Sequence, residues 1–214
     1  MGNKARTFFR ESERQRIEEA IQSVECCTIG EVAVVVTDGS DHYLEAEVLG
    51  SIFLSSFASL LLTMVFFHAS LWSYIPFSIL FFFPFKILLS KIPVLKLSLV
   101  GKKRKEAAVR QGALKAFYER GLYRTKQNTG VLFYLSLLEH KVWVLADKGI
   151  YEKIDQELLN TFAQNVSRGI REGHACDALC REISAAGKVL ATHFPLTPGD
   201  TNELPNQVMT EHQE

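Results

Sequence analysis

The pattern of hydrophobic and polar positions divides the chain into charged stretches and one long apolar stretch. Residues 48–85 form a run of 38 residues without a single Asp, Glu, Lys or Arg. One bilayer-spanning helix needs about 20 apolar residues, so this run is long enough for two. We predict a transmembrane hairpin within residues 48–100, with its two spans at about residues 50–69 and 71–90.

Two other structures are possible for the apolar run. A hairpin buried in the core of a soluble protein is disfavoured, because nine of the fifteen Phe residues lie within residues 53–85 and the rest of the chain is too small to cover them. A re-entrant hairpin is the second alternative, since Pro76 and Pro84 interrupt the second span and Lys86 follows closely. Membrane helices tolerate Pro and a terminal Lys can snorkel, so we favour a hairpin that crosses the bilayer.

The basic residues predict how this hairpin is oriented. Seven of them lie in or after the end of the second span with no acidic residue among them: Lys86, Lys91, Lys96, Lys102, Lys103, Arg104 and Lys105. Lys and Arg are retained on the cytoplasmic side. We therefore expect an integral protein of the inner (plasma) membrane with both termini in the cytoplasm. The bilayer is its first partner, and the cluster at residues 102–105 should contact anionic headgroups.

Outside the apolar run, the spacing of apolar residues predicts short regular elements. Helices are expected at about residues 12–25, 105–120, 151–166 and 175–192. The helix at residues 105–120 should turn inward Val109, Ala113, Ala116 and Phe117. Strands are expected at residues 30–36, 131–138 and 141–146. The last two strands are joined only by Glu139 and His140, which predicts a hairpin, whereas a helical crossover makes the first two parallel if they are neighbours.

These elements predict an α/β fold, a small sandwich in which helices cover a mixed sheet and which the two-helix transmembrane hairpin interrupts. Residues 1–47 hold a single buried strand with nothing to pair with. We therefore expect residues 1–47 and 101–194 to form one domain. Residues 195–214 contain three Pro among mixed polar residues and predict an extended or disordered tail.

Composition and charge exclude several functions. The chain has 24 Lys and Arg against 24 Asp and Glu, so it has no bulk attraction for nucleic acid, and we expect no nucleic-acid partner. Four Cys are too few for a disulfide framework. The sequence also contains no Gly-x-Ser-x-Gly elbow, Walker loop or dinucleotide-binding glycine motif, so serine-hydrolase and nucleotide-driven mechanisms are unsupported.

Four short motifs in order give the chain a resemblance to a known family. They are Thr-Ile-Gly-Glu-Val at residues 28–32, Thr-Gly-Val-Leu at 129–132, Ala-Asp-Lys-Gly-Ile at 146–150, and His-Phe-Pro at 193–195 with Gly-Asp-Thr-Asn-Glu-Leu-Pro at 199–205. With them the chain resembles the TPM domain family, which includes thylakoid-lumen repair proteins, an acetylcholine-receptor modulator and many bacterial membrane proteins. The ending is similar to the bacterial subgroup whose domain is split by a transmembrane hairpin.

The resemblance suggests two functions of different classes. No settled activity comes with the split subgroup, so the first hypothesis is a binding or assembly module for another membrane protein in envelope maintenance. Members of the family have also been described as phosphatase-like or as divalent-metal binders. The second hypothesis is therefore a divalent-metal-dependent phosphatase.

One candidate metal site follows from the predicted sheet. Glu31 begins a buried strand and Asp147 follows another, and the third strand should run antiparallel to the first, so both carboxylates should lie at one edge with Thr28 and Gly149. Oxygen ligands of this kind suit Ca²⁺ or Mg²⁺. The alternative is that Glu31 is a solvated charge and that Asp147 only makes a turn and caps the next helix.

Two further groups of side chains could carry chemistry. The opposite edge of the sheet collects a set that could bind a metal or act as acid and base, or simply form polar turns: Asp38, Asp41, His42, Glu139 and His140. Cys176 and Cys180, with His174 just before them, have a spacing that zinc permits. Without a second well-spaced pair we favour reduced thiols used for packing, and the pair Cys26 and Cys27 is distant in sequence.

Overall fold

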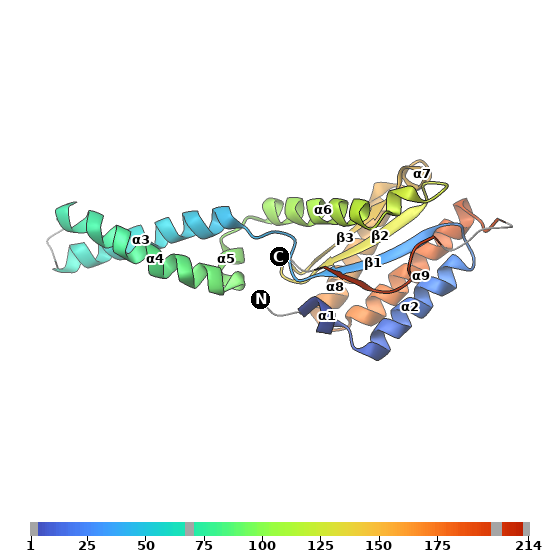
Figure 1. The fold of residues 1–214 in the computed structure, drawn as a ribbon, viewed down its shortest axis with the longest axis horizontal. Coiled ribbons are helices and arrows are strands. Elements are labelled where there is room, and N and C mark those ends of the chain that lie inside the picture. Colours follow the sequence, from blue (N-terminus) through green and yellow to red (C-terminus); the bar gives the residue numbers. More distant parts are fainter. Residues whose placement is uncertain (1–3, 67–70, 198–202, 212–214) are drawn as a thin grey trace. The chain divides into compact units, whose positions relative to one another are not determined.

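The computed structural model describes residues 4–66, 71–197 and 203–211. It forms two compact units (Figure 1). We call Met1–Asp41 with Glu106–Glu214 the α/β unit, and His42–Lys105 the helical unit. The helical unit is thus inserted within the sequence of the α/β unit, and it begins and ends about five residues outside the predicted insertion of residues 48–100.

A mixed sheet of four strands lies at the centre of the α/β unit. The strands are β1 (Glu31–Thr37), β2 (Gly130–Ser136), β3 (Lys141–Ala146) and β4 (Met209–Glu211), in the spatial order β3-β2-β1-β4. β1 runs parallel to both β2 and β4, whereas β2 and β3 form an antiparallel hairpin. The parallel pairing of the first two strands and the hairpin of the next two are confirmed.

Helices cover both faces of this sheet (Figure 1). α2 (Glu11–Glu25), α8 (Gln156–Glu172) and α9 (Ala175–His193) pack on one face, against Val32, Val34 and Val36 of β1. α6 (Lys102–Glu119) packs on the other face, through the four inward residues expected from its periodicity. Every residue of β1 is buried because both faces are covered, which explains its unbroken β-branched run.

The short elements of the α/β unit differ from the prediction. A helix was expected at residues 151–166, but α7 (Lys148–Tyr151) is separate and α8 begins only after Asp155 and continues to Glu172. Gly173, at φ +80°, ends α8 in the left-handed conformation that favours glycine. α1 (Lys4–Phe8) and the 3₁₀ helix η1 (Leu122–Arg124) were not predicted.

The C-terminal tail contributes to the sheet. β4 lies within the stretch predicted to be extended or disordered, and its backbone pairs with the end of β1, with Val35 opposite Met209. Leu204 and Met209 also pack on the face that α6 covers. Of the described tail residues, only Met209–Glu211 form a strand, and the place of this strand in the sheet was not predicted.

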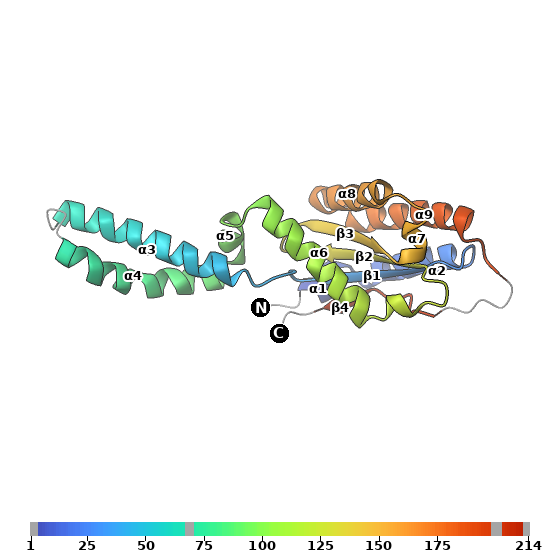
Figure 2. The same ribbon diagram turned by 90° about the horizontal axis from the view of Figure 1, so that it is seen from above.

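The helical unit contains α3 (Leu44–Phe66), α4 (Leu71–Lys91) and α5 (Pro93–Ser98). α3 and α4 pack along one another, and both are long and apolar enough to cross a membrane (Figure 2). α4 matches the predicted second span to within one residue. α3 begins six residues before the predicted first span, and residues 67–69 of that span lie outside the described residues.

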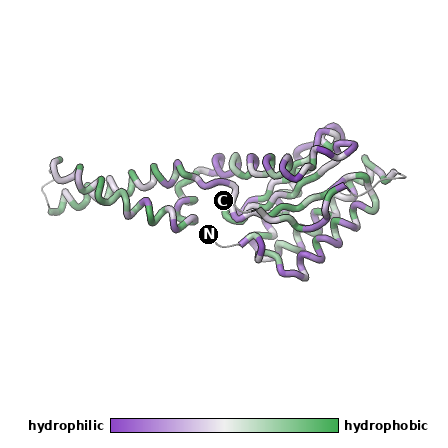
Figure 3. The backbone as a smooth tube through the Cα atoms, viewed as in Figure 1, coloured by the Kyte–Doolittle hydropathy of each residue, from purple (hydrophilic) through white to green (hydrophobic). Residues whose placement is uncertain are grey.

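The burial pattern of the hairpin is the reverse of that in a soluble core. The buried residues of α3 recur at every fourth position and are mostly small and polar: Glu47, Ser51, Ser55, Ser59 and Thr63. Small residues of this kind allow two helices to approach closely, and the Ser59 hydroxyl donates a hydrogen bond to the Tyr74 carbonyl at 2.8 Å. The large apolar residues of α3 are exposed, with Phe53 at 68%. Figure 3 shows how apolar residues dominate both α3 and α4.

Candidate functional site

The structure places Glu31 and Asp147 at the same edge of the sheet, on either side of β2. Glu31 is paired with Gly130, and the Asp147 amide donates to the Gly130 carbonyl at 2.9 Å. Side chains alternate along a strand, so Glu31 shares the face of Ala33, and Asp147 shares the face of Leu145. Both carboxylates therefore point to the face that α6 covers, with two strand spacings, roughly 10 Å, between their backbones.

Gly130 lies between the two carboxylates and has no side chain to separate them. The Leu122 carbonyl oxygen, from η1, lies 2.8 Å from the position that a Cβ of residue 130 would take. Any other residue at 130 would therefore collide with this backbone. Three groups with oxygen atoms that could coordinate a cation therefore lie along this edge: the Glu31 carboxylate, the Leu122 carbonyl and the Asp147 carboxylate.

Glu31 is a buried structural carboxylate, so its interpretation as a solvated strand-end charge is wrong. The residue is 5% exposed, and Oε1 accepts a hydrogen bond from the Glu203 amide at 3.0 Å. Glu203 in turn forms an ion pair with Lys126 at 3.2 Å. Glu31 thus fastens the C-terminal segment beside the start of β1, and its Oε2 atom is buried as well.

Asp147 caps α7, as the alternative interpretation expected. Its Oδ1 atom accepts a hydrogen bond from the Lys148 amide at 2.7 Å. Its Oδ2 atom is buried, and no residue in the described part of the chain offers it a hydrogen bond. A buried carboxylate oxygen without a partner is costly and calls for a physical explanation, such as a bound ion.

Thr28 and Gly149 lie at this edge, but both serve the fold. The Thr28 hydroxyl donates to the Phe194 carbonyl at 2.5 Å and accepts from the Gly30 amide at 3.1 Å. A Cβ at residue 149 would lie 2.7 Å from the Asn128 carbonyl oxygen. Gly149 is therefore required for the close approach of the loop before β2.

A third carboxyl group, Glu25 at the end of α2, completes the arrangement and was not predicted. Its Oε1 atom accepts a hydrogen bond from the Val32 amide at 3.2 Å, and its side chain also interacts with Glu31 and Asn206. Burial, and to a smaller extent the negative charge of Glu31, raises the pKa of Glu25 to about 7. Nothing in a polar helix end marks this Glu as different from its solvated neighbours.

The oxygen donors at this edge fit a hard cation better than a transition metal. Glu31 and Asp147 would hold it, with the Leu122 carbonyl between them, and Ca²⁺ and Mg²⁺ accept such carboxylate and carbonyl ligands. Within residues 4–66, 71–197 and 203–211, no group of three or more His, Cys, Asp or Glu side chains is arranged to hold a metal. A cation here would therefore depend on backbone carbonyls and water as well.

The acidic residues of the opposite edge stabilise loops. The Asp38 carboxylate accepts a hydrogen bond from the Ala5 amide at 2.6 Å. Glu139 is 6% exposed and accepts from the Ser40 amide at 3.1 Å and from the Ser136 hydroxyl. The Asp38 carboxylate thus links α1 to the end of β1, and the Glu139 carboxylate links the segment after β1 to the end of β2.

The other three polar residues of that set have different surroundings. Asp41 is partly buried. His140 is exposed and adopts the left-handed conformation at φ 50° in the β2–β3 turn. His42 belongs to the helical unit, where its carbonyl accepts a hydrogen bond from Lys96 Nζ at 2.5 Å.

Cys176 and Cys180 pack against α2, whereas Cys26 and Cys27 are exposed. Cys176 and Cys180 lie one turn apart on α9, and their thiols point to the α2 carbonyls of Glu13 at 3.7 Å and Arg16 at 3.8 Å. Burial raises the pKa of both thiols, that of Cys180 to about 12. Buried thiols of this kind commonly serve as small packing groups between helices.

Comparison with known proteins shows a fold and no family. No family model matches the chain, and no curated protein matches it. Among solved structures it is similar to the NMR structure of BA42 from the psychrophilic bacterium Bizionia argentinensis. The TM-score is 0.60 at 19% identity, covering 95% of this chain and 96% of that chain. At this identity the likeness concerns the mixed α/β architecture alone.

Proposed function

We propose that this protein is a membrane-anchored, cytoplasm-facing domain of the TPM type that acts as a binding or assembly module for another membrane protein in envelope maintenance. The helical unit is its anchor, and the α/β unit is its working part. The order of four short motifs supports the TPM assignment, and the seven basic residues after the hairpin support a cytoplasmic location for both termini.

The observation that carries the anchor is the reversed burial of the hairpin. α3 buries its Ser and Thr row and exposes its Phe and Leu side chains, and large exposed apolar surfaces mark contact with a protein or a membrane. The two helices, of 23 and 21 residues, are long and apolar enough to cross the hydrocarbon core of a membrane.

Cysteine labelling tests the anchor and its orientation. Ser73 is exchanged for Cys in a chain whose exposed Cys26 and Cys27 are replaced by Ser. An impermeant reagent should label residue 73 from the outer face of intact cells, and a reporter fused after residue 214 should behave as cytoplasmic. Labelling from the cytoplasmic side alone would indicate a re-entrant hairpin. Recovery of the chain in the soluble fraction would contradict the proposed membrane anchor.

A divalent-metal-dependent phosphatase is the second candidate. The buried Asp147 Oδ2 atom favours it, because a cation beside it would supply the missing partner. A bound Ca²⁺ or Mg²⁺ would polarise a phosphate oxygen. Glu31 and Asp147 would hold the ion, and the surrounding carbonyl groups would limit its freedom.

Metal-dependent stability and activity separate the two functions. Metal-stripped full chain is heated with and without millimolar Ca²⁺ or Mg²⁺ and assayed on a generic phosphate ester. A cation site raises the melting temperature by mass action, and Asp147→Asn should abolish the rise. Asp38→Asn, at the opposite edge, is the matched control. If neither cation changes the melting temperature, the phosphatase hypothesis is contradicted and the binding module is the remaining proposal.

A further inference from the structure

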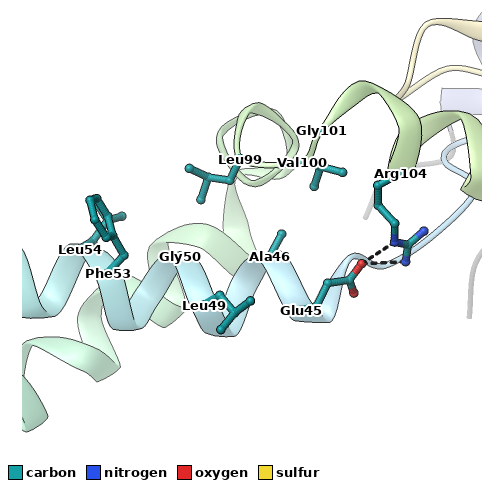
Figure 4. Close-up of a pocket in the computed structure, with 10 residues that line it drawn as sticks. All are labelled: Glu45, Ala46, Leu49, Gly50, Phe53, Leu54, Leu99, Val100, Gly101 and Arg104. Carbon is teal, nitrogen blue, oxygen red and sulfur yellow. Dashed lines mark hydrogen bonds and ion pairs between the residues drawn. The ribbon is translucent and has the colours of Figure 1, made fainter.

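A cavity opens within the helical unit, between the start of α3 and the segment that connects α5 to α6 (Figure 4). Its volume is about 310 Å³, at the lower end of the range for ligand-binding pockets. All residues that line it belong to the helical unit. Gly50 lies at its wall, where a Cβ would come within 2.5 Å of Leu99, so the wall is formed by close packing of α3 and this segment.

The two ends of the cavity have opposite chemistry. Glu45 and Arg104 form one end, where Nε and Nη2 of Arg104 donate to the same Glu45 oxygen at 2.8 and 2.7 Å. Phe53 and Leu54 form the other end (Figure 4). Glu45 and Phe53 are eight residues apart on α3, a rise of about 12 Å. The lining therefore changes from charged to apolar over the distance from a lipid headgroup to the upper part of its chains.

The charge around the polar end favours an anion. The helical unit has seven basic residues and two acidic residues. One acidic residue, Glu47, is buried in an ion pair with Lys96 at 3.5 Å. Lys102 and Lys103 adjoin Arg104 in sequence and are exposed, with no ion pair in the described part of the chain. At the polar end of the cavity, the basic run at residues 102–105 therefore outnumbers the acidic Glu45.

We propose that this cavity binds one anionic phospholipid, with its phosphate at Arg104 and one acyl chain along Leu49 and Phe53. The inference rests on the proposed membrane anchor, which brings the groove to the lipid. Inorganic phosphate would leave the apolar wall uncovered, and a zwitterionic lipid would not compensate the excess positive charge. Charge complementarity and the change in polarity along the cavity therefore favour an anionic phospholipid as its ligand.

Glu45 competes with the lipid for Arg104. The guanidinium presents a planar fork that binds a carboxylate or a phosphate, and Glu45 already uses two of its N–H groups. The two charged residues should therefore act in opposite directions. Removal of Arg104 removes the group that binds the phosphate, whereas removal of the Glu45 charge makes the two N–H groups that Glu45 occupies available to the phosphate.

Lipid retention by the full chain tests the proposal. The protein is placed in phosphatidylcholine vesicles that contain a minor fraction of phosphatidylglycerol with the same chains, extracted in mild detergent, and its bound lipid measured by mass spectrometry. We expect about tenfold enrichment of phosphatidylglycerol. Arg104→Gln should abolish the enrichment, Glu45→Gln should increase it, and Lys91→Gln, which changes a basic residue outside the cavity, should preserve it within about twofold.

The opposite signs distinguish a lipid site from a structural ion pair. Both substitutions break the same Glu45–Arg104 contact, so a merely structural pair would lower retention in both variants and overturn the proposal. Equal retention of the two lipids would overturn it too, as would displacement of phosphatidylglycerol by inorganic phosphate alone. A photoreactive amino acid in place of Leu49 should give a lipid adduct, whereas a cross-link to a second chain would assign the groove to a protein helix.

Membrane retention of each variant is measured in parallel, by resistance to alkaline carbonate extraction. A wild-type chain that stays in the membrane without lipid selectivity would refute the lipid site and leave the anchor standing. A wild-type chain released by carbonate would refute the anchor itself. The two proposals therefore fail in different ways.

Discussion

The two units of the chain bury opposite kinds of side chain. In the α/β unit, β1 buries Val32, Val34 and Val36 completely, as expected for a domain surrounded by water. In the helical unit, α3 buries Ser51 and Ser59 and exposes aromatic and aliphatic residues on its outer face. The polarity of the buried side chains thus differs between the two units, and this difference supports the proposed membrane anchor more directly than the hydropathy of the helices does.

The largest effect is expected when the hairpin of the helical unit is removed, which tests whether the α/β unit folds without it. Replacement of residues 48–100 by a flexible linker of about ten residues should move the protein to the soluble fraction and leave the α/β unit folded. Loop-closure entropy changes by only ~0.6 kcal/mol for each twofold change in length, so β1 and β2 should still pair. Circular dichroism and cooperative unfolding measure the result. An insoluble product at several linker lengths would show that the α/β unit depends on the hairpin.

The same substitution in both units gives a sharper test. Val34→Ser places a hydroxyl and a cavity in the core and should lower the free energy of unfolding by about 2–4 kcal/mol. Val65→Ser, on the exposed face of α3, should change it by less than about 0.5 kcal/mol. The fluorescence of Trp143 reports unfolding of the α/β unit once Trp72 is replaced by Phe. Equal effects at the two positions would contradict the comparison.

The smallest effect concerns the buried charges. The helical unit pairs Glu47 with Lys96, whereas the α/β unit places two carboxyl groups, Glu25 and Glu31, together. The pKa of Glu25 lies near 7 in the folded chain and at its ordinary value, about 4.5, when unfolded, so the folded state binds the proton more tightly. Its contribution to stability is complete below pH 4.5 and is lost as the pH rises through 7.

Denaturant unfolding between pH 4 and pH 8 measures this contribution as a difference between two proteins. Glu25→Gln cannot ionise, so it should gain stability relative to the wild-type protein as the pH rises from 4.5 to 7. The gain should be about 1 kcal/mol or less, because Glu25 is only partly buried and solvent screens its charge. Glu19→Gln, on the exposed face of α2, is the control and should follow the wild-type protein at every pH.

Helices and strands whose hydrophobic pattern extends over many residues could be predicted from the sequence. α6 turns the four predicted residues toward the sheet, and β1 lies in parallel beside β2 because a helical crossover connects them. β4 could not be predicted, since a strand of three residues has too few positions to show alternation and is defined only by its pairing with β1. The start of α8 was misplaced because the apolar pattern continues through α7 while the backbone turns between the two helices.

The candidate site was predictable only where strand order decides the geometry. Antiparallel pairing of β2 and β3 is sufficient to bring Glu31 and Asp147 to one edge. Three other features depend on how helices and loops pack on that edge. They are the contact of Glu25 with Glu31, the Leu122 carbonyl beside Gly130, and the buried Asp147 Oδ2 atom. No local pattern in the sequence encodes such packing, because it arises from residues far apart along the chain.

The pairing of β1 with β2 also has a consequence for biosynthesis. Glu31 and Gly130 are neighbours in the sheet, yet 99 residues separate them along the chain. At roughly 5–20 residues per second, the ribosome makes β1 about 5–20 s before its partner. The whole hairpin emerges during that interval. In the proposed topology, the hairpin is therefore already inserted in the bilayer when the sheet forms. β1 remains unpaired at the membrane surface until β2 has been made.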